Sequence, residues 1–523
     1  MQIIIPMSGF GERFRKVGYK VPKPLIQVNN KEIIKYVIDL FPGEDNFTFI
    51  CNQDHLDTND FRMQEIIKEY CPTAKIIGIP AHKLGPVHAI EIASNDIDDN
   101  DEVIVNYCDF ACNWDYKDFL KHIKLTESIG CIPSYKGFHP HNYGKTNYAY
   151  LKLHNDQLID IQEKKPYTDD KTQEYASSGT YYFKSGKILK ESINHCKLNN
   201  LNINGEYYVS LCYKHLIEQG YKITPYHIKY FMQWGTPDDL NEYNYWSDLF
   251  KNLNTNNSLK NIPNLKTFLL MSGEGKRFSK EGYPAPKPML QVDNKQMFQR
   301  VFDFIPQGSN SDKYVISRKD ISKFITDKTS LNIYDIDKVT NGQASSAHIG
   351  INKFNLEPND MVQVSCCDSA MIINNKIFLE TLKTDFDILV YSSQNYPYAN
   401  NNPEAYGWLE IDENKNIKSC SIKTKEGQKD SIILGSFIFK NKEVFNNLYH
   451  KLVDSNLRIN DEFYIDSMIK LALSESMICK SVDCKFIVNW GTPFDYETYK
   501  YWNECFSSWF NHPYKIDNNE TSI

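Results

Sequence analysis

Short apolar runs alternate with helix-like patterns through the first part of the chain. The runs at residues 3–6, 47–51, 75–79 and 103–106 each have the length of one strand. Between the first two runs, residues 31–41 place apolar side chains at the spacing of one helical face. Strands that alternate with helices predict an α/β fold with a mostly parallel, doubly wound sheet.

The pattern becomes richer in strands between residues 130 and 183. Further strands are predicted at 148–153, 157–162 and 178–183, followed by helices at 187–195 and 206–219. We interpret these strands as a small mixed sheet added beside the main one. Ligands of doubly wound sheets bind beyond the carboxyl ends of the strands, so we expect the added strands to cover that region as a lid.

The whole pattern occurs twice. MSGFGERF at 7–14 returns as MSGEGKRF at 271–278, and the closing WGTP at 234–237 returns at 490–493. A chain of 523 residues also exceeds what one hydrophobic core normally supports. We therefore predict two tandem Rossmann-like, doubly wound mixed sheets, each with a small β-rich lid, at 1–250 and 265–506. A polar linker at 251–264 joins them, a tail follows at 507–523, and the two copies could form an intrachain pseudo-dimer or assemble as a homo-oligomer.

Composition narrows the classes of function. With 41% hydrophobic residues, 24% charged residues and a net charge of -7, the chain is typical of a globular protein and does not favour a nucleic-acid partner. No apolar run approaches the length of a membrane span. The 13 cysteines form no CxxC pair and Met1 leads directly into a strand, which favours reduced thiols in a cytoplasmic protein.

Two glycine loops carry the candidate chemistry. In the first loop, Gly9 and Gly11 are followed by Arg13 and then by Lys23 between two prolines. Glycine lets the backbone approach a phosphate, and Arg and Lys supply positive charge to phosphoryl oxygens. Neither loop matches a Walker loop or a dinucleotide-binding fingerprint. A tight turn without a ligand is therefore the alternative to a phosphate-binding loop. The second copy has the same order, with Gly273, Gly275, Arg277 and Lys287.

The combination of MSGxGxRF with PKP resembles the signature loop of the sugar-phosphate nucleotidyltransferases. The resemblance implies transfer of a nucleoside monophosphate from a nucleoside triphosphate to a sugar-1-phosphate or similar small phosphorylated acceptor, with release of pyrophosphate. Synthesis of precursors for capsule or another surface polysaccharide is the setting that it suggests. It implies catalytic roles for Arg13, Lys23, Arg277 and Lys287, and nucleotide binding by Ser8, Gly9, Gly11, Ser272, Gly273 and Gly275.

An aspartate after the strand at 103–105 is a candidate metal ligand. Asp109 stands there, and Asp368 stands at the equivalent place in the second copy. The resemblance implies that both hold Mg²⁺, which takes one or two carboxylates together with phosphates and water; a helix-capping aspartate is the alternative. Where the family usually carries a second metal aspartate, the chain has Gln233 and Asn489. Three alternatives follow for the metal site. One aspartate together with the phosphates is sufficient, or the Gln233 carbonyl supplies the missing ligand, or the nearby Asp238 supplies it.

The stretch IQEKKP at 161–166 resembles the acceptor motif of the family. The resemblance implies that Glu163 accepts sugar hydroxyls and that Lys164 holds the acceptor phosphate, with Lys165 as a rival; Gly179 and Glu206 complete the likeness. In the second copy we align Ser421 and Ile422 with this pair, which leaves Lys423 as the possible substitute. The second copy therefore takes a different acceptor or is degenerate.

Small residues at a helix start are the third shared feature. Gly85 and Ala89 in the first copy match Gly342 and Ser346 in the second. Such residues let a flat base lie against the backbone, and the resemblance implies base recognition by this loop. Tight helix packing is an equal alternative for each of them.

Two other classes of function compete with this reading. A GT-A-type glycosyltransferase, which consumes a nucleotide-sugar, would need a DxD metal motif, and NYCDF at 106–110 is not one. A non-catalytic nucleotide-binding scaffold is disfavoured for the first copy by its retained Arg13, Lys23, Asp109, Glu163 and Lys164. For the second copy this scaffold reading remains open.

Overall fold

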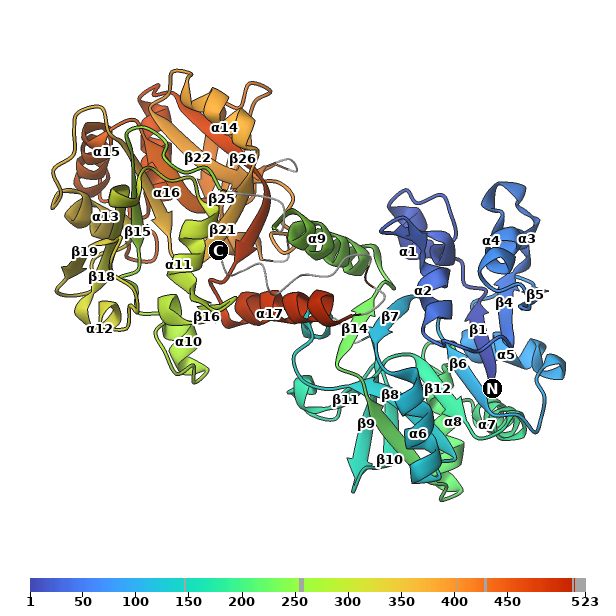
Figure 1. Cartoon of the computed structure of the whole chain (residues 1–523). Coiled ribbons are helices and arrows are strands. Elements are labelled where there is room, and N and C mark those ends of the chain that lie inside the picture. The colour runs from blue at the N-terminus through green and yellow to red at the C-terminus, as the bar shows by residue number, and fades with distance from the viewer. Residues whose placement is uncertain (145–146, 254–257, 401, 428–429, 510–511, 513–523) are drawn as a thin grey trace. The chain divides into compact units, whose positions relative to one another are not determined.

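The computed structural model describes residues 1–144, 147–253, 258–400, 402–427, 430–509 and 512. The chain forms two units, which Figure 1 shows in one colour ramp. Among the described residues, unit 1 comprises Met1–Trp246 and the chain from Tyr501, and unit 2 comprises Ser247–Lys500. Helix α9 (Pro237–Leu253) therefore begins in unit 1 and ends in unit 2, whereas helix α17 (Pro493–Ser508) begins in unit 2 and ends in unit 1.

The sheet of unit 1 is built around β1 (Gln2–Met7), all of whose residues are buried. β1 pairs in parallel with β4 (Phe47–Asn52) and β6 (Val103–Asn106), and β4 pairs in parallel with β5 (Lys75–Ile79). These four strands are the apolar runs of the sequence. Central parallel strands appear in the sequence as continuous apolar runs, because helices cover both faces of the sheet and the side chains on both faces are buried.

Six further strands extend this sheet on the β6 side. The order is β10-β9-β11-β8-β12-β6-β1-β4-β5, with β13 beside β8. The joins from β6 through β12, β8, β11 and β9 to β10 are all antiparallel, so the sheet is mixed. The added strands are β8 Gly130–Tyr135, β9 Ala149–His154, β10 Gln157–Glu163, β11 Tyr175–Ser177, β12 Thr180–Phe183 and β13 Ile223–His227. Two small sheets lie apart from this one: β2 (Gln27–Val28) pairs with β3 (Lys31–Glu32), and β7 (Phe110–Asn113) pairs with β14 (Tyr230–Gln233).

The strands that we expected as a separate lid sheet belong to the main sheet. β9 to β11 are joined to it through the pairing of β11 with β8. The strand predicted at 178–183 begins only at Thr180, because Gly179, with a φ of 97°, interrupts the extended backbone between β11 and β12. The helix predicted from Glu206 begins at Val209, because the backbones of Ile203 and Glu206 form a β-bridge.

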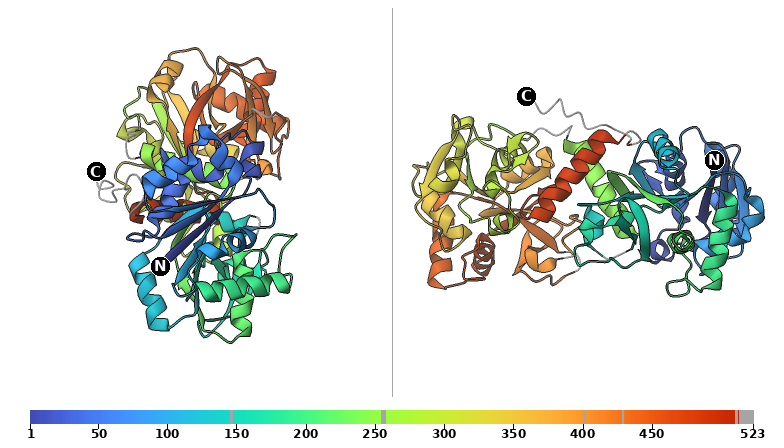
Figure 2. Two further views of the ribbon diagram at one scale, coloured as in Figure 1. Left: turned by 90° about the vertical axis from the view of Figure 1, so that its right-hand side faces the viewer. Right: turned by 90° about the horizontal axis from the view of Figure 1, so that it is seen from below.

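Helices cover both faces of the unit 1 sheet, as the views of Figure 2 show. Residues of α5, α7 and α8 pack with those of β1, β4 and β6 in one apolar cluster, which includes Ile4, Val105 and Leu189. The helices are α1 Glu12–Lys16, α2 Ile33–Asp39, α3 Gln53–Asp57, α4 Met63–Tyr70, α5 Pro86–Ile92, α6 Tyr116–Thr126, α7 Gly186–Leu198, α8 Val209–Glu218 and α9.

Unit 2 has a second ten-stranded mixed sheet. Its order is β19-β18-β15-β20-β25-β22-β26-β21, with β23 beside β24 and β25. This follows the order of unit 1, except that β25 spans the places of β11 and β12 and β26 spans those of β13 and β14. The strands are β15 Leu265–Leu270, β18 Lys313–Arg318, β19 Asn332–Ile336, β20 Met361–Cys366, β21 Ser369–Ile373, β22 Ile388–Ser393, β23 Gly407–Ile411, β24 Ile417–Ile422, β25 Ser431–Phe439 and β26 Cys479–Asn489, and β16 (Gln291–Val292) pairs with β17 (Lys295–Gln296).

The helices of unit 2 take corresponding places. Residues of α13, α15 and α16 pack with β15, β20 and β25 in one apolar cluster, which includes Phe268, Val364 and Phe437. The helices are α10 Lys276–Lys280, α11 Met297–Phe304, α12 Lys319–Ser322, α13 Gln343–Ile351, α14 Asn375–Leu382, α15 Lys442–Asp454, α16 Ile465–Ser474 and α17.

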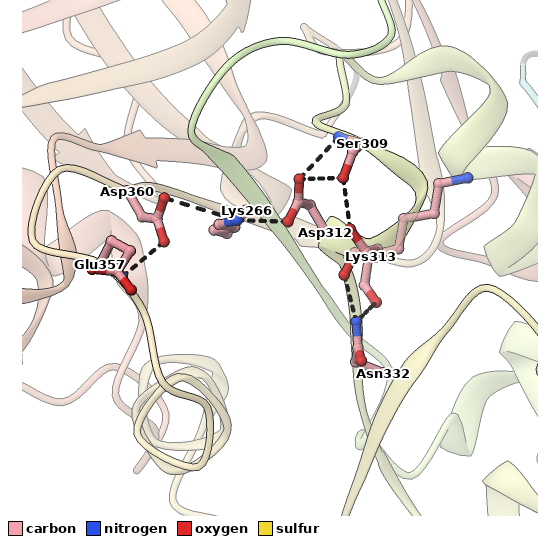
Figure 3. Close-up of polar contacts among 8 residues, drawn as sticks. Lys266, Ser309, Asp312, Lys313, Asn332, Glu357 and Asp360 are labelled. Carbon is pink, nitrogen blue, oxygen red and sulfur yellow. Dashed lines mark hydrogen bonds and ion pairs between the residues drawn. The ribbon is translucent and has the colours of Figure 1, made fainter.

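A cluster of ion pairs and hydrogen bonds connects Lys266, near the amino end of β15, with the segments that contain Asp312 and Asp360 (Figure 3). The Nζ of Lys266 lies 2.6 Å from Oδ1 of Asp312 and 3.8 Å from Oδ1 of Asp360. Asp312 also accepts hydrogen bonds from the backbone N–H and the hydroxyl of Ser309. Because the glycine loop follows the carboxyl end of β15, this cluster is structural and lies away from the candidate site.

Three expectations concern the chain as a whole. All 13 cysteines are free thiols, and all except Cys366 are buried. Among the described residues, no helix combines the length and apolar character needed to cross a bilayer. Within the predicted tail, Trp509 is buried in unit 1 against the rings of Tyr36 and Trp234. Residues 510–511 and 513–523 of the tail, and residues 254–257 of the predicted linker, lie outside the described residues.

Candidate active site

The loop between β1 and α1 is shaped by Gly11. Its φ of 63° and ψ of 31° are left-handed, a conformation that glycine adopts at little cost. A Cβ added to Gly9 would meet no atom within 4 Å, so the loop is open on that side. The loop of unit 2 repeats both properties, with a φ of 64° at Gly275 and open space at Gly273. Both loops leave room for a ligand beside their backbone.

Lys23 forms an ion pair with Asp109. Lys23 begins a 3₁₀ turn after Pro22, and its Nζ lies 2.7 Å from Oδ2 of Asp109, in the short connection between β6 and β7. Burial acts to lower the pKa of Lys23, but the Asp109 carboxylate outweighs burial and raises it. Lys23 is therefore a permanent cation facing the end of β6.

The equivalent pair in unit 2 has the same geometry. The Nζ of Lys287 lies 2.5 Å from Oδ2 of Asp368. Burial acts against both charges, but each partner outweighs it, so the pKa of Lys287 is raised and the pKa of Asp368 is lowered. Both units therefore hold a lysine in an ion pair with an aspartate at this point.

Gln233 converges with Asp109 over Gly235. A Cβ added to Gly235 would lie 2.8 Å from Nε2 of Gln233 and 3.2 Å from Oδ2 of Asp109. In unit 2, a Cβ added to Gly491 would lie 2.9 Å from Oδ1 of Asn489 and 3.3 Å from Oδ2 of Asp368. Glycine therefore makes room for an aspartate and an amide side by side in each unit.

Asp239, and not Asp238, is the second carboxylate near Asp109. Asp238 is exposed. Burial, with a smaller contribution from the charge of Asp109, raises the pKa of Asp239 to about 6. Asp239 also accepts a 2.6 Å hydrogen bond from the hydroxyl of Thr236 at the start of α9. The sequence-based interpretation missed this residue, although its recurrence as Asp495 in the second WGTP motif was a signal for it.

Glu163 is the last residue of β10, and its side chain is buried. It accepts a 2.5 Å hydrogen bond from the hydroxyl of Ser210, in the first turn of α8. Burial raises the pKa of Glu163 to about 7, and the hydrogen bond from Ser210 opposes this only in part. Glu163 therefore changes its charge near neutral pH.

Lys164 and Glu206 meet through Tyr208. The Nζ of Lys164 donates a 2.5 Å hydrogen bond to the hydroxyl of Tyr208, which in turn donates to Glu206. Lys165 is exposed, so of the two lysines Lys164 is the one that faces this network. Tyr208 and Ser210 are site residues that sequence reasoning missed, because only the return of α8 to β10 brings them here.

Gly85 is held by close backbone packing. It has a φ of 85°, and an added Cβ would lie 2.6 Å from the carbonyl oxygen of Tyr207 and 2.7 Å from its nitrogen. Gly342 has a φ of 119° and would meet the backbone of Phe463 at 2.6 Å and 2.8 Å. The packing alternative therefore accounts for both glycines, although Gly85 also lines the cavity described below.

Gly85→Ala is expected to lower the free energy of unfolding by about 2 to 4 kcal/mol, because overpacking adds to the cost of a positive φ. Gly43→Ala is the matched control, since Gly43 has a φ of 92° but no atom within 4 Å of an added Cβ. Urea denaturation of both variants measures the difference. Equal losses would show that φ alone, and not contact with Tyr207, requires glycine at residue 85.

One cavity of about 470 Å³, a size typical of small-molecule sites, is lined by most of these groups, with Ser210 and Asp239 outside its lining. Ala89 is outside it, buried in the core on α5, which corrects its assignment to nucleotide binding. The remaining predicted residues of unit 1 all line the cavity: Ser8, Gly9, Gly11, Arg13, Lys23, Gly85, Asp109, Glu163, Lys164, Gly179, Glu206 and Gln233.

Residues 2–249 match the family model described as Nucleotidyl transferase. Residues 2–249 therefore belong to the nucleotidyl transferase family. This nucleotidyl transferase segment contains the glycine loop, Asp109, Glu163 and the first WGTP motif, and it ends before β15.

The nucleotidyl transferase segment also carries the likeness to curated relatives. The Bifunctional protein GlmU of Clostridioides difficile is 26% identical over 225 residues, which is 42% of this chain and 45% of the relative. The Mannose-1-phosphate guanylyltransferase catalytic subunit beta of Dictyostelium discoideum is 27% identical over 174 residues, 31% of this chain and 45% of the relative. The chain spans less than half the length of these curated relatives.

Solved structures are similar over one unit. A nucleoside-diphosphate-sugar pyrophosphorylase from Vibrio cholerae RC9 is 23% identical, covers 46% of this chain and 97% of its own, and has a TM-score of 0.37. The inositol-1-phosphate CTP transferase from T. maritima is 17% identical, covers 46% of this chain and 95% of its own, and has a TM-score of 0.35.

Unit 2 has a cavity of about 320 Å³ at the place of the unit 1 site. Arg277 is exposed and stands outside the residues that line it. The lining includes Ser346, Glu462 and Tyr464 together with the predicted residues Ser272, Gly273, Gly275, Lys287, Gly342 and Asp368.

The structure also corrects our alignment of the two acceptor motifs by one residue. The N–H of Lys164 donates to the carbonyl of Tyr148, and the N–H of Lys423 donates in the same way to Tyr406. Both lysines have a positive φ, 58° and 62°. Lys423 is therefore the counterpart of Lys164, and Ile422, not Ser421, is the counterpart of Glu163.

Proposed function

We propose that unit 1 transfers a nucleoside monophosphate from a nucleoside triphosphate to a sugar-1-phosphate or similar small phosphorylated acceptor. One observation carries the proposal: the glycine loop with Lys23 and the Glu163–Lys164 pair line the same cavity. A cavity with cationic groups at both of these places suits two phosphorylated substrates. The proposed product is a nucleotide-activated building block, for which surface-polysaccharide synthesis is the setting that we favour.

In the proposed reaction, an oxygen of the acceptor phosphate forms a bond to the α-phosphorus of the triphosphate. The bond from that phosphorus to the bridging oxygen breaks, and pyrophosphate leaves with the electron pair. Such a step needs positioning and charge neutralisation more than a protein nucleophile. Lys23 would neutralise charge at the α-phosphate, and Arg13 with the loop N–H groups would hold the leaving phosphates.

The donor set at Asp109 fits Mg²⁺. This ion commonly binds one or two carboxylates and takes its other oxygens from phosphates and water. Asp109 supplies a carboxylate, and the amide of Gln233 beside it could supply a carbonyl oxygen. Bound there, Mg²⁺ would neutralise phosphate charge during transfer.

The acceptor would lie against Glu163 and Lys164. The ionised Glu163 would accept hydrogen bonds from acceptor hydroxyls, and Lys164 would pair with the acceptor phosphate. Tyr208 and Glu206 hold the lysine side chain in place through the network described above. We further propose that unit 2 is a second nucleotidyltransferase copy, on the basis of its strand order and its Lys287–Asp368 pair.

A substrate screen tests the proposed function. The full chain would be incubated with Mg²⁺ and each of ATP, GTP, CTP, UTP and dTTP against a panel of phosphorylated sugars, polyols and amino-alcohols, and pyrophosphate release would be measured. We expect release with one nucleotide and a narrow group of acceptors. Release of nucleoside diphosphate from a nucleotide-sugar, with no pyrophosphate formed in any mixture, would favour a glycosyltransferase instead.

The stability of the free protein is expected to depend on Glu163 and pH. Its pKa is about 7 in the folded chain against 4.5 as reference, so the folded state disfavours the charged form. This penalty is absent well below pH 4.5 and fully present above pH 7. Glu163→Gln should therefore raise the free energy of unfolding at pH 8 by on the order of 3 kcal/mol, and change it little at pH 4. Denaturation at both pH values, with the exposed Glu69→Gln as control, measures this; a pH-independent difference would contradict it.

The same variant is expected to impair use of the acceptor. Below pH 7, protonation of Glu163 removes charge from the group that accepts acceptor hydroxyls, so kcat/KM for the acceptor should fall as the pH is lowered through about 7. In Glu163→Gln this step of the pH profile should disappear and KM for the acceptor should rise. A pH profile that Glu163→Gln leaves unchanged would exclude the residue from acceptor binding.

A further inference from the structure

The acceptor region of unit 2 contains a carboxylate that reaches it from a different element. In unit 1, Glu163 is paired across the strands with Ala149, and its carboxylate accepts from Ser210 on α8. In unit 2, the paired residues at these two strand positions are Ile422 and Gly407. The strand therefore supplies an apolar side chain where unit 1 has a carboxylate.

Asp466 stands in unit 2 at the place of Ser210. Gly85 packs against the backbone of Tyr207 and Gly342 packs in the same way against Phe463, which aligns the starts of α8 and α16. Three residues further along, Ser210 and Asp466 are each the second residue of their helix. Ser210 touches the Glu163 carboxylate, so Asp466 reaches toward the same region from the opposite side.

Gly407 makes the room that this carboxylate needs. A Cβ added to Gly407 would lie 2.6 Å from Oδ2 of Asp466, so the methyl group of an alanine, as at residue 149, could not stand there beside it. Three differences between the units thus agree with one another: Glu163 is replaced by Ile422, Ser210 by Asp466, and Ala149 by Gly407. Asp466 is a partly exposed residue that is not among those lining the 320 Å³ cavity, whereas Tyr464, two residues before it, lines that cavity and lies beside Lys423, whose Nζ is 5.9 Å from the centroid of the Tyr464 ring.

We propose that unit 2 binds an acceptor of its own, a small phosphorylated alcohol or amino-alcohol, with Asp466 accepting from its hydroxyl or ammonium group and Lys423 pairing with its phosphate. The proposal rests on the function proposed above, and the transfer step is the same. Ile422 offers this acceptor an apolar contact in place of the second polar group that unit 1 has. This difference favours an acceptor with fewer hydroxyls than a hexose phosphate.

Burial raises the pKa of Asp466 to about 6, so its carboxylate is charged at pH 8, the pH chosen for the test. The first measurement uses the full chain with Lys23→Ala, which removes the unit 1 cation. We expect this variant to keep pyrophosphate release with a phosphorylated alcohol or amino-alcohol that Lys287→Ala no longer uses. If the unaltered chain is active but Lys23→Ala abolishes release with every acceptor, the inference is overturned and the function of unit 1 stands. If the unaltered chain releases no pyrophosphate at all, the proposed function itself has failed.

The second measurement isolates Asp466 in the Lys23→Ala chain. Asp466→Asn keeps the shape and removes the charge, and it is expected to raise KM for the unit 2 acceptor about 10- to 100-fold while KM for the nucleotide is unchanged. Asp454→Asn, an exposed acid on α15, is the matched control and should change neither. An unchanged KM for the acceptor in a folded Asp466→Asn variant would overturn the proposal.

A pair exchange keeps the proposal testable if Asp466→Asn does not fold. Ile422→Glu combined with Asp466→Ser restores the arrangement of unit 1, and in the Lys23→Ala chain it should transfer activity toward the acceptor of unit 1. Thermal unfolding confirms that this double variant is folded. An unchanged order of acceptor preference in the folded double variant would contradict a role for these two positions in choosing the acceptor.

Discussion

Lys23→Ala is expected to slow pyrophosphate release with the unit 1 acceptor about a hundred- to a thousandfold, the range found when one charge-stabilising donor is removed from a transition state. Its Nζ lies 2.7 Å from Asp109 in the lining of the cavity. Lys83 also lines the cavity near the glycine loop, but its Nζ pairs with Glu12, so we do not expect it to replace Lys23 beside Asp109. Arg13→Ala should have an effect of similar size, because Arg13 is exposed at the loop and free to hold the leaving phosphates.

Two controls separate this effect from general loss of charge or fold. Lys20 is an exposed lysine three residues before Lys23, and Lys20→Ala should leave the rate unchanged. Lys287→Ala removes the equivalent cation of unit 2 and should leave release with the unit 1 acceptor unchanged. Thermal unfolding of each variant shows whether the fold survives the loss of the ion pair. Near-normal turnover in Lys23→Ala would refute the assignment of Lys23 and the glycine loop to triphosphate binding, and equal losses in Lys23→Ala and Lys287→Ala would show that the two units are equivalent.

Asp109→Asn is expected to lower the Mg²⁺-dependent rate by at least about a hundredfold. The variant removes the carboxylate that fits Mg²⁺ and leaves Lys23 without its partner, so transition-state charge is stabilised less. Gln233→Asp places a second carboxylate over Gly235 and should lower the Mg²⁺ concentration needed for half-maximal rate. Titration of Mg²⁺ against initial rates measures both effects.

The control for this site is Asp238, which is exposed on α9. Asp238→Asn should keep the full rate and the same dependence on Mg²⁺. Full activity in Asp109→Asn together with loss of activity in Asp238→Asn would show that we have placed the metal site at the wrong aspartate.

Local patterns in the sequence were sufficient for the elements at the centre of unit 1. The strands predicted at 75–79 and 103–106 have those bounds in β5 and β6, because a short apolar run between polar stretches can be buried only as a strand at this length. The repeated motifs likewise indicated that Lys23 and Asp109 belong to one site. Both residues follow central elements of a doubly wound sheet, and the carboxyl ends of such strands share one edge.

Strand pairing decided what the sequence could not. The added strands joined the main sheet instead of forming a separate lid, because β11 pairs with β8 through contacts between residues more than 40 positions apart. Both hairpins carry the same pairing irregularity, but the connection between their strands is one residue longer in unit 2, where Ile411 pairs with Ile417, than in unit 1, where Leu153 pairs with Leu158. Because this extra residue shifts every later position, counting along the sequence placed Ile422 opposite Lys164 instead of Glu163.

The sequence by itself therefore determined the α/β class, the repeated order of motifs and the twelve predicted residues that line the unit 1 cavity, because each depends on local pattern. Only the tertiary structure placed Ser210 beside Glu163, Asp239 near Asp109 and Asp466 over Gly407. Ser210 and Asp466 come from helices that return to the sheet after long connections, and Asp239 comes from the start of α9, shortly after β14. Their side chains meet the site because packing brings together segments that are distant in the chain.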